Sequence, residues 1–112
     1  MKKEKREQIW NKYDKKCAYC GCELKYKEMQ VDHIESKNLH LRHKIEGVDR
    51  MSNLNPSCRQ CNFYKSDGSL SLFRNQLSTI NDRLNKIFIV RLAIRFGILK
   101  YKEFDNKFYF ER

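Results

Sequence analysis

Residues 17–20 read Cys-Ala-Tyr-Cys and residues 58–61 read Cys-Arg-Gln-Cys, so the chain carries two CxxC pairs. Two such pairs supply four thiolates, the ligand number of a closed tetrahedral zinc site. We therefore expect Cys17, Cys20, Cys58 and Cys61 to hold one structural zinc ion that stabilises the fold and takes no part in chemistry. A redox-active CxxC pair and an iron–sulfur cluster are the alternatives, although the βαβ pattern typical of a redox pair is missing. The fifth cysteine, Cys22, is interpreted as an ordinary small side chain.

The length of 112 residues fits one domain with one modest core. A hydrophobic fraction of 40% and an aromatic fraction of 12% are sufficient for folding and too high for a disordered chain. Small domains often need a cross-link such as a disulfide or a structural metal for stability, and the zinc site would provide one. We expect residues 1–112 to form a single domain, with a motif core at 17–67 and a C-terminal helical extension and hairpin at 68–112.

The first ten residues, MKKEKREQIW, contain no apolar run that resembles a signal peptide, and no stretch of the sequence is long enough to span a membrane. We therefore expect a cytoplasmic protein with no membrane partner. In a reducing compartment disulfides are rare and clustered cysteines more often bind metal, which favours zinc over disulfides here.

The chain is strongly basic, with a formal net charge of +10 and a pI near 9.5. Four thiolates around one Zn²⁺ would lower this balance only to about +8. The positive residues are spread along the whole sequence instead of forming one tail. A basic domain of this kind favours a nucleic acid as partner, because Lys and Arg contact phosphates. The alternative is that the charges only keep a small protein soluble.

The spacing of apolar residues predicts several elements around the cysteines. Residues Lys2 to Lys16 form a charged helix with Ile9, Trp10 and Tyr13 on one side. A β-capable run from Met29 to Ile34 and a short one from Asn53 to Pro56 indicate two strands. The stretch from Glu35 to Met51 has little periodicity and is expected to be a long surface loop. It contains His40 and His43, for which we expect no function, with phosphate contact as the alternative.

Beyond the second cysteine pair the pattern is helical. Apolar residues recur at steps of three and four from residue 70 to residue 87, which predicts one amphipathic helix; they are Leu70, Phe73, Leu77, Ile80, Leu84 and Ile87. A further short helix from about Ile89 to Phe96 is expected to stop at Gly97. The tail from Tyr101 to Phe110, with a turn at Asp105-Asn106, is interpreted as a closing hairpin.

Between the cysteine pairs stands Val31-Asp32-His33-Ile34, and around the second pair runs Asn53-Leu-Asn-Pro-Ser-Cys58-Arg-Gln-Cys61-Asn62-Phe-Tyr-Lys65. This order of CxxC, DHI, NLxPxCxxCN and a lysine three residues later resembles the HNH endonucleases with a zinc-binding variant of the ββα-metal fold. The later FR, apolar-helix, RFGI and FYFE elements are similar to small stand-alone bacterial and phage HNH proteins. The resemblance implies an α+β fold: a ββα-metal core with a four-cysteine zinc site, flanked by an N-terminal helix and by C-terminal helices with a hairpin.

The resemblance also implies roles for individual residues. His33 would end the first strand and activate the attacking water, while Asp32 would point across the strand to a metal ion. Asn62 would be the second protein ligand, and Asn53 would pin the loop that carries His33. Lys65 would face phosphate. The third motif position is Asn62 instead of histidine, a variant familiar in the family, and its oxygen together with the carboxylate of Asp32 suits Mg²⁺ or Mn²⁺.

The residue types fit this chemistry on their own. Phosphodiester hydrolysis needs a nucleophile, a neutralised transition state and a stabilised leaving oxygen, which one histidine and one metal ion can supply. An unperturbed histidine titrates at about pH 6.5, so His33 can accept a proton from water near neutral pH. We therefore expect a metal-dependent endonuclease acting on double-stranded DNA. A catalytically inactive zinc module that binds nucleic acid and a zinc-stapled interaction domain are the alternatives; nicking or double-strand cleavage, sequence specificity and oligomeric state are not readable.

Overall fold

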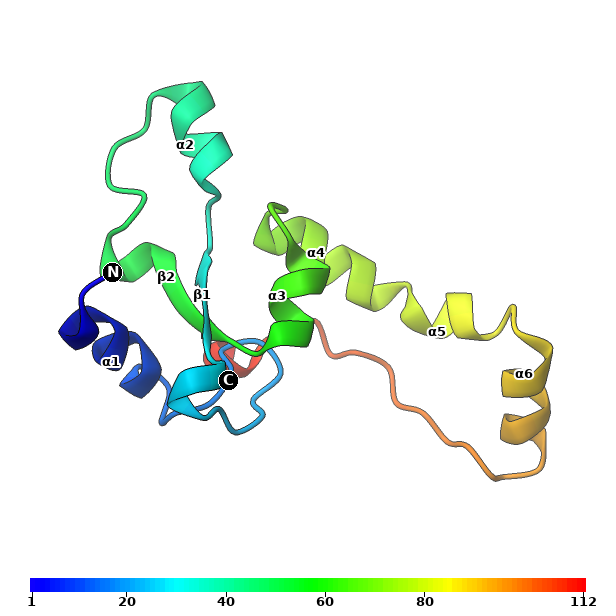
Figure 1. The fold of residues 1–112 in the computed structure, drawn as a ribbon. Helices are drawn as coiled ribbons and strands as arrows, with labels where there is room; N and C mark the ends of the chain where they lie inside the picture. The colour runs from blue at the N-terminus through cyan, green and yellow to red at the C-terminus, as the bar shows by residue number, and fades with distance from the viewer.

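The computed structural model describes all residues from Met1 to Arg112 and has an α+β fold around a two-stranded sheet (Figure 1). In chain order the elements are α1 (Lys3–Asn11), β1 (Gln30–His33), α2 (Lys37–His43), β2 (Leu54–Ser57), α3 (Arg59–Lys65), α4 (Leu70–Ser78), α5 (Ile80–Leu84) and α6 (Phe88–Arg95), with 3-10 turns at Tyr26–Glu28, Met51–Asn53 and Tyr109–Glu111. The order β1, β2, α3 is the predicted ββα core, and the α+β class is confirmed. None of the helices has the length and apolar character needed to cross a membrane.

Helix α1 is shorter than the predicted Lys2–Lys16. It ends at Asn11 because Asp14 and Lys15 have φ values of 55° and 63°, which a right-handed helix does not accept. Ile9 is fully buried, and the indole of Trp10 donates a hydrogen bond to the carbonyl of Leu24 at 2.9 Å. These contacts fix α1 against the segment that leads into β1.

The two predicted strands are present and pair with each other in antiparallel fashion. Gln30 lies opposite Ser57 and His33 lies opposite Leu54. Pro56 has no N–H to donate, which suits a strand with no third strand on its outer side. The carbonyl of Pro56 accepts a hydrogen bond of 2.9 Å from the backbone of Ala18. This bond joins the sheet directly to the first CxxC pair.

The segment from Glu35 to Met51 is not entirely a loop, because it contains helix α2. Ser36 caps this helix by accepting a hydrogen bond from the backbone of Leu39 at 3.0 Å, and Lys44 ends it with a left-handed φ of 54°. Seven residues make only about two turns. Such a short helix shows little hydrophobic periodicity, so only its capping residues, Ser36 and Lys44, could have indicated it in the sequence.

The helix predicted from residue 70 to residue 87 is divided. Helices α4 and α5 meet at Thr79, and Ile87 is extended with a φ of −95° and a ψ of 120°. Leu70, Phe73 and Leu77 pack against the core, whereas α5 has no buried residue. The apolar stripe thus loses its packing partner halfway along. The next helix, α6, ends at Arg95, and Gly97 follows with the predicted left-handed conformation, φ 72°.

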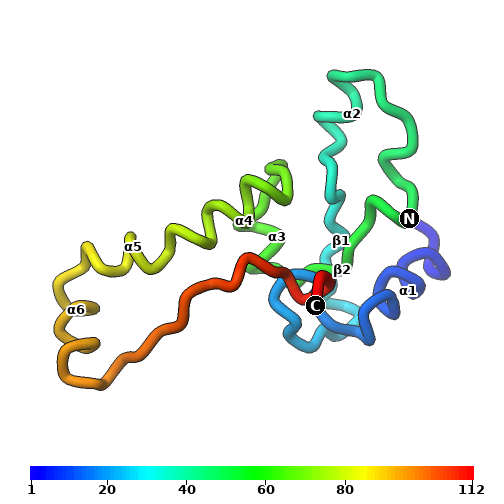
Figure 2. The backbone as a smooth tube through the Cα atoms, turned by 180° about the vertical axis from the view of Figure 1, so that it is seen from behind, coloured from blue at the N-terminus to red at the C-terminus, as the bar shows by residue number.

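The tail does not form the hairpin predicted from Tyr101 to Phe110. It runs back to the core as an extended segment and ends in a 3-10 turn (Figure 2). The backbone N–H groups of Tyr109 and Phe110 donate to the carbonyls of Tyr19 and Ala18 at 3.0 and 2.8 Å. The tail therefore pairs with the first CxxC segment and not with itself.

The core lies under this returning tail. The rings of Tyr19, Phe73 and Phe108 pack in edge-on and tilted contacts with centroids 4.9 to 5.4 Å apart. The buried apolar cluster contains Ile9, Cys17, Tyr19, Leu24, Met29, Leu54, Phe73 and Phe108. Residues from both ends of the chain thus enclose the β1–β2–α3 unit.

Candidate active site and zinc centre

The four predicted zinc ligands lie together. Cys17 and Cys20 come from the turn after α1, while Cys58 and Cys61 come from the start of α3, and all four Sγ atoms lie within 4.8 Å of one another. The Sγ atoms of Cys20 and Cys58 are 3.8 Å apart. Thiolates at about 2.3 Å from a tetrahedral zinc ion would be separated by about 3.8 Å. The donor set and its spacing fit a structural zinc site.

The thiols lie close enough to change one another's protonation. A hydrogen bond from Cys61 lowers the pKa of Cys17 to about 4, and the same hydrogen bond raises the pKa of Cys61. One thiolate therefore forms only while its neighbour keeps a proton. Four thiolates at this distance require a positive ion between them. Cys22 is exposed and lies outside the cluster of four.

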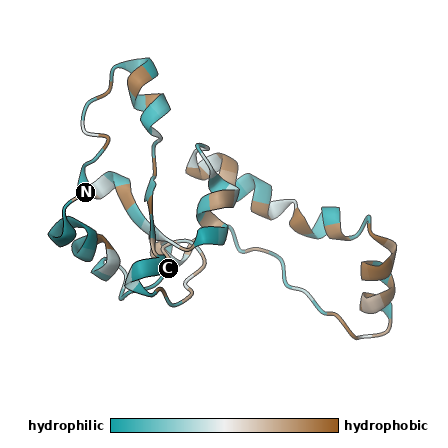
Figure 3. Ribbon diagram, in the orientation of Figure 1, coloured by the Kyte–Doolittle hydropathy of each residue, from teal (hydrophilic) through white to brown (hydrophobic).

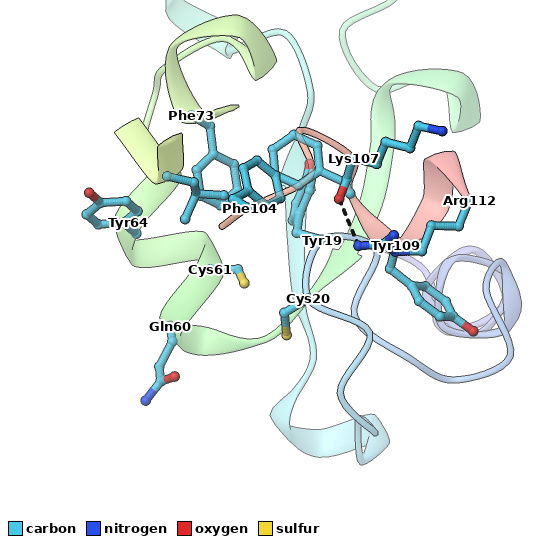
Figure 4. A pocket seen from close by; sticks show the side chains of 12 residues that line it. Tyr19, Cys20, Gln60, Cys61, Tyr64, Phe73, Phe104, Lys107, Tyr109 and Arg112 are labelled. Carbon is cyan, nitrogen blue, oxygen red and sulfur yellow. Dashed lines mark hydrogen bonds between the residues drawn. The ribbon is translucent and has the colours of Figure 1, made fainter. Parts of the chain in front are cut away.

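An apolar pocket of about 420 Å³ lies beside the cysteines, between α3, α4 and the tail. Figure 4 shows the rings of Phe73 and Phe104 on one side of this pocket and the sulfur atoms of Cys20 and Cys61 on another. Its lining contains none of the motif residues Asp32, His33 and Asn62. The pocket is a gap in the packing of the tail and not the candidate active site.

The motif residues meet in a different cleft, of about 550 Å³, between the end of β1, the start of α2 and α3. Asp32 and His33 come from β1, and Asn62 comes from the first turns of α3. Lys37 and Asp67 also line this cleft. The fold thus brings three of the four predicted site residues, Asp32, His33 and Asn62, to one cleft, and Asn53 lies outside its lining.

His33 has a partner that the sequence did not indicate. Its Nε2 atom lies 2.7 Å from Oδ1 of Asp49, which belongs to the connection between α2 and β2. The His33 side chain is 19% exposed and that of Asp49 is 60% exposed. The hydrogen bond from His33 holds the pKa of Asp49 below its ordinary value. Asp49 stands in a stretch without periodicity, so no sequence signal linked it to His33.

Asp32 is buried and makes two polar contacts. The hydroxyl of Tyr19 donates a short hydrogen bond to Oδ2 of Asp32, and Nζ of Lys65 lies 3.2 Å from the same oxygen. Burial raises the pKa of Asp32, although Tyr19 and Lys65 act in the opposite direction. Burial and the neighbouring carboxylate also raise the pKa of Tyr19. Asp32 is therefore held in place by a tyrosine from the zinc-ligand turn.

Lys65 does not lie where the sequence interpretation placed it. Its side chain is fully buried, it pairs with Asp32, and it donates a hydrogen bond of 3.0 Å to the carbonyl of His33. The expectation that Lys65 faces phosphate is therefore corrected. The physical reason is that Lys65 lies on the side of α3 that faces β1, where the Asp32 carboxylate compensates its charge.

Asn53 joins the segments on both sides of the cleft. Its carboxamide accepts from the backbone N–H of Glu35 at 2.8 Å and donates to the carbonyls of Glu35 and Val48 at 3.0 and 2.7 Å. The backbone carbonyl of Asn53 accepts a hydrogen bond from the backbone N–H of Ile34 at 2.9 Å. These four bonds tie the chain directly after His33 to the start of β2.

The two other histidines differ in their environments. His40 is buried inside α2, makes no hydrogen bond through its ring, and has Glu35 Oε1 at 3.6 Å. A buried ring cannot contact phosphate, so this alternative is excluded for His40 in this conformation. His43 is exposed near the end of the same helix.

Comparison with known proteins agrees with this geometry. The HNH endonuclease family model matches residues 17–68, a range that contains both cysteine pairs, β1, β2 and α3. No curated protein and no solved structure matched the chain. HNH nucleases act on nucleic acids, so the family match supports a nucleic acid as the partner. On the family match and the cluster of four cysteines, residues 17–68 of this chain belong to the HNH endonuclease family, in its zinc-binding form.

Proposed function

We propose that this protein is a metal-dependent endonuclease that hydrolyses phosphodiester bonds of double-stranded DNA. The observation that carries the proposal is the meeting of Asp32, His33 and Asn62 in one open cleft within the family-matched segment. A binding module has no need for a carboxylate, an imidazole and a carboxamide around one cleft.

The donor set of the cleft fits a hard divalent cation. The carboxylate of Asp32 and the carboxamide oxygen of Asn62 are oxygen ligands of the kind that Mg²⁺ and Mn²⁺ prefer. When bound, such an ion would neutralise charge on the phosphate and stabilise the leaving oxygen. In the structure, the ammonium group of Lys65 compensates the charge of Asp32. Tyr19 keeps the Asp32 carboxylate in a fixed orientation.

The contact with Asp49 supports Nδ1 of His33 as the nitrogen that acts as the base. The pKa of Asp49 lies below its ordinary value, so its carboxylate is ionised near neutral pH and can only accept a hydrogen bond. Nε2 of His33 must then carry the proton, and Nδ1 keeps the lone pair. His33 accepts a proton from the attacking water at Nδ1. The resulting imidazolium is stabilised by the Asp49 carboxylate.

The DNA backbone would be attracted by the charge of the protein. Lys37 lines the cleft, Arg42 lies on the same helix, and the whole chain carries a formal charge of +10. Contacts of Lys and Arg with phosphate give affinity that decreases with salt and does not depend on sequence.

A plasmid cleavage assay with Mg²⁺ tests the proposal. Wild-type protein is expected to cut, and His33→Ala is expected to lower the rate by about 10²- to 10⁴-fold while zinc content and DNA affinity stay near wild type. Asn62→Ala should lose activity, and high Mn²⁺ should partly restore it because mass action refills a weakened site. Asp32→Ala should lose activity as well, and its folding must be measured alongside because the substitution leaves the buried Lys65 without its partner.

The variants also control for a contaminating nuclease, because such a contaminant would cleave DNA in every preparation. A His33→Ala protein that cleaves at the wild-type rate, while the Asp32→Ala preparation is inactive, would show that His33 is not the base. DNA binding without cleavage by zinc-loaded wild-type protein, with either Mg²⁺ or Mn²⁺, would instead assign the chain as a zinc-stabilised nucleic-acid-binding module.

A further inference from the structure

The segment from Ile80 to Lys107 forms an arm that leaves the core through α5, turns at α6 and returns as an extended chain (Figures 1 and 2). Specific hydrogen bonds hold it together. The amide of Asn85 donates to the hydroxyl of Tyr101 at 2.8 Å, and the backbone of Ile98 donates to Ala93 at 2.9 Å. The arm is therefore held in a defined conformation by its own contacts.

The tip of this arm is apolar and exposed. Helix α6 has no buried residue, although it is the most hydrophobic element in Figure 3. Large apolar side chains with exposed fractions between 38% and 82% follow one another along the tip; they are Ile87, Phe88, Ile89, Phe96, Ile98, Leu99 and Tyr101. We call these seven residues the tip patch.

The tip patch is large enough for a protein interface. With about 150–200 Å² for a fully exposed large side chain, the exposed fractions correspond to roughly 700 Å². The largest apolar patch of an ordinary monomer measures about 300–600 Å². A standard interface buries about 800 Å² on each partner. The tip patch thus has the area that one partner contributes to a stable dimer.

The composition of the tip also favours a protein partner over nucleic acid. From Ile87 to Leu99 the only charged residues are Arg91 and Arg95, and there is no Lys, Asp or Glu. Aromatic residues and Arg are enriched in the centres of protein interfaces, where Lys, Asp and Glu are depleted. Surfaces that bind DNA are polar and rich in cations throughout.

We propose that the tip patch is a homodimer interface, in which α6 of one copy packs against α6 of a second copy. Arg91 and Arg95 are four residues apart and therefore share one side of the helix. The rest of the α6 surface carries only apolar residues, and part of it can pack against the same part of the partner's helix. Arg91 lies over the ring of Phe88, with Cζ 5.9 Å from its centroid, and donates a hydrogen bond to the carbonyl of Asn85, so its charge stays within its own arm at the border of the apolar surface. The inference does not depend on the proposed nuclease activity.

The charges around the tip give the dimer a characteristic response to salt. Between Arg83 and Lys102 the arm has six cations and no acidic residue; they are Arg83, Lys86, Arg91, Arg95, Lys100 and Lys102. Two such arms repel each other, and salt screens this repulsion over a Debye length of about 8 Å at physiological ionic strength. The dimer should therefore become tighter as salt is raised. Contacts with DNA or with an acidic protein would become weaker.

Sedimentation of the zinc-loaded full chain over a concentration series tests the proposal. We expect the mass to rise from 13.6 kDa to twice this value, at lower protein concentration when salt is added. Phe88→Glu and Ile98→Glu should each raise the dissociation constant by at least about tenfold, because each places a charge within the apolar surface that the dimer buries. Both side chains are exposed, so zinc content and fold should not change.

Leu41→Glu is the matched control, because Leu41 is an equally exposed leucine on α2 outside the tip patch. It should dimerise like wild type. A protein that remains monomeric at about 100 μM in high salt would overturn the proposal. A dimer that persists unchanged in the Phe88→Glu/Ile98→Glu double variant would overturn it as well, since the interface would then lie elsewhere.

Discussion

The buried pair of Lys65 and Asp32 makes a quantitative prediction for Lys65→Met. Methionine keeps most of the side-chain volume and removes the ammonium group, which lies 3.2 Å from Asp32 and donates to the carbonyl of His33 at 3.0 Å. Breaking a buried ion pair costs about 3–5 kcal/mol, because the remaining carboxylate loses its counterion. The total stability of a domain is only about 5–15 kcal/mol, so this loss would be large.

Urea denaturation of the zinc-loaded protein measures this loss as a shift of the midpoint at constant slope. Lys27→Met, at an exposed lysine without an ion pair in the structure, is the matched control and should stay within about 0.5 kcal/mol of wild type. The double variant Asp32→Asn/Lys65→Met should recover most of the stability, since replacing both partners of a buried pair is often nearly neutral.

The dependence on pH follows from Asp32. Burial already raises its pKa in the folded protein, and removing Lys65 raises it further. A carboxyl group with a raised folded pKa destabilises the fold above that pKa, and this penalty decreases as pH falls through it. The defect of Lys65→Met should therefore become smaller in acid. A Lys65→Met protein with wild-type stability at pH 7 would refute the reasoning, because the ion pair would then contribute nothing measurable to the fold.

Three further predictions concern the zinc site, the base and the tail. Cys17→Ser should unfold or aggregate, because structural zinc contributes on the order of 10 kcal/mol in small domains; elemental analysis should find one zinc per wild-type chain, and a fully folded zinc-free protein would contradict this. Asp49→Ala should lower kcat about 10- to 100-fold with KM and fold unchanged, and Asp49→Asn should restore part of it because its carbonyl still accepts from His33; equal loss in both variants would exclude a positioning role. Glu111→Gln should cost up to about 1 kcal/mol by breaking its ion pair with Arg74 at 2.6 Å. Because Arg74 lowers the pKa of Glu111, this stabilisation is present above the ordinary value of 4.5 and lost as pH falls through the folded pKa, so wild type and variant should converge in acid.

Several parts of the fold could be predicted because their signals are local. The two CxxC pairs named the cysteines that meet in space, since only residues with the right ligand atoms at the right spacing can close such a site. The strands around His33 and Pro56 and the helix before Gly97 followed from short runs of apolar residues and from a glycine that accepts a left-handed conformation.

Other parts could not be predicted because they depend on contacts between distant segments. The tail has a sequence compatible with a hairpin, but its backbone pairs with Ala18 and Tyr19. These two carbonyls are available as acceptors only after the first cysteine turn has folded. The pattern beyond Leu77 is continuous in sequence, yet the helix divides at Thr79, where the core ends. Periodicity shows which residues share a face and does not show what covers that face.

In the candidate site, too, some features could be predicted from local sequence and others depend on contacts between distant segments. The sequence by itself identified Asp32, His33 and Asn62 as the candidate residues for the proposed chemistry, because an ordered motif specifies residue types along the chain. The tertiary structure alone decided what surrounds them: Asp49 against His33, and Tyr19 and Lys65 against Asp32. The physical reason is that the orientation and ionisation of a side chain depend on charges and donors within a few ångströms. In this protein those groups come from the cysteine turn, from α3 and from an aperiodic connection, which only the folded chain brings together.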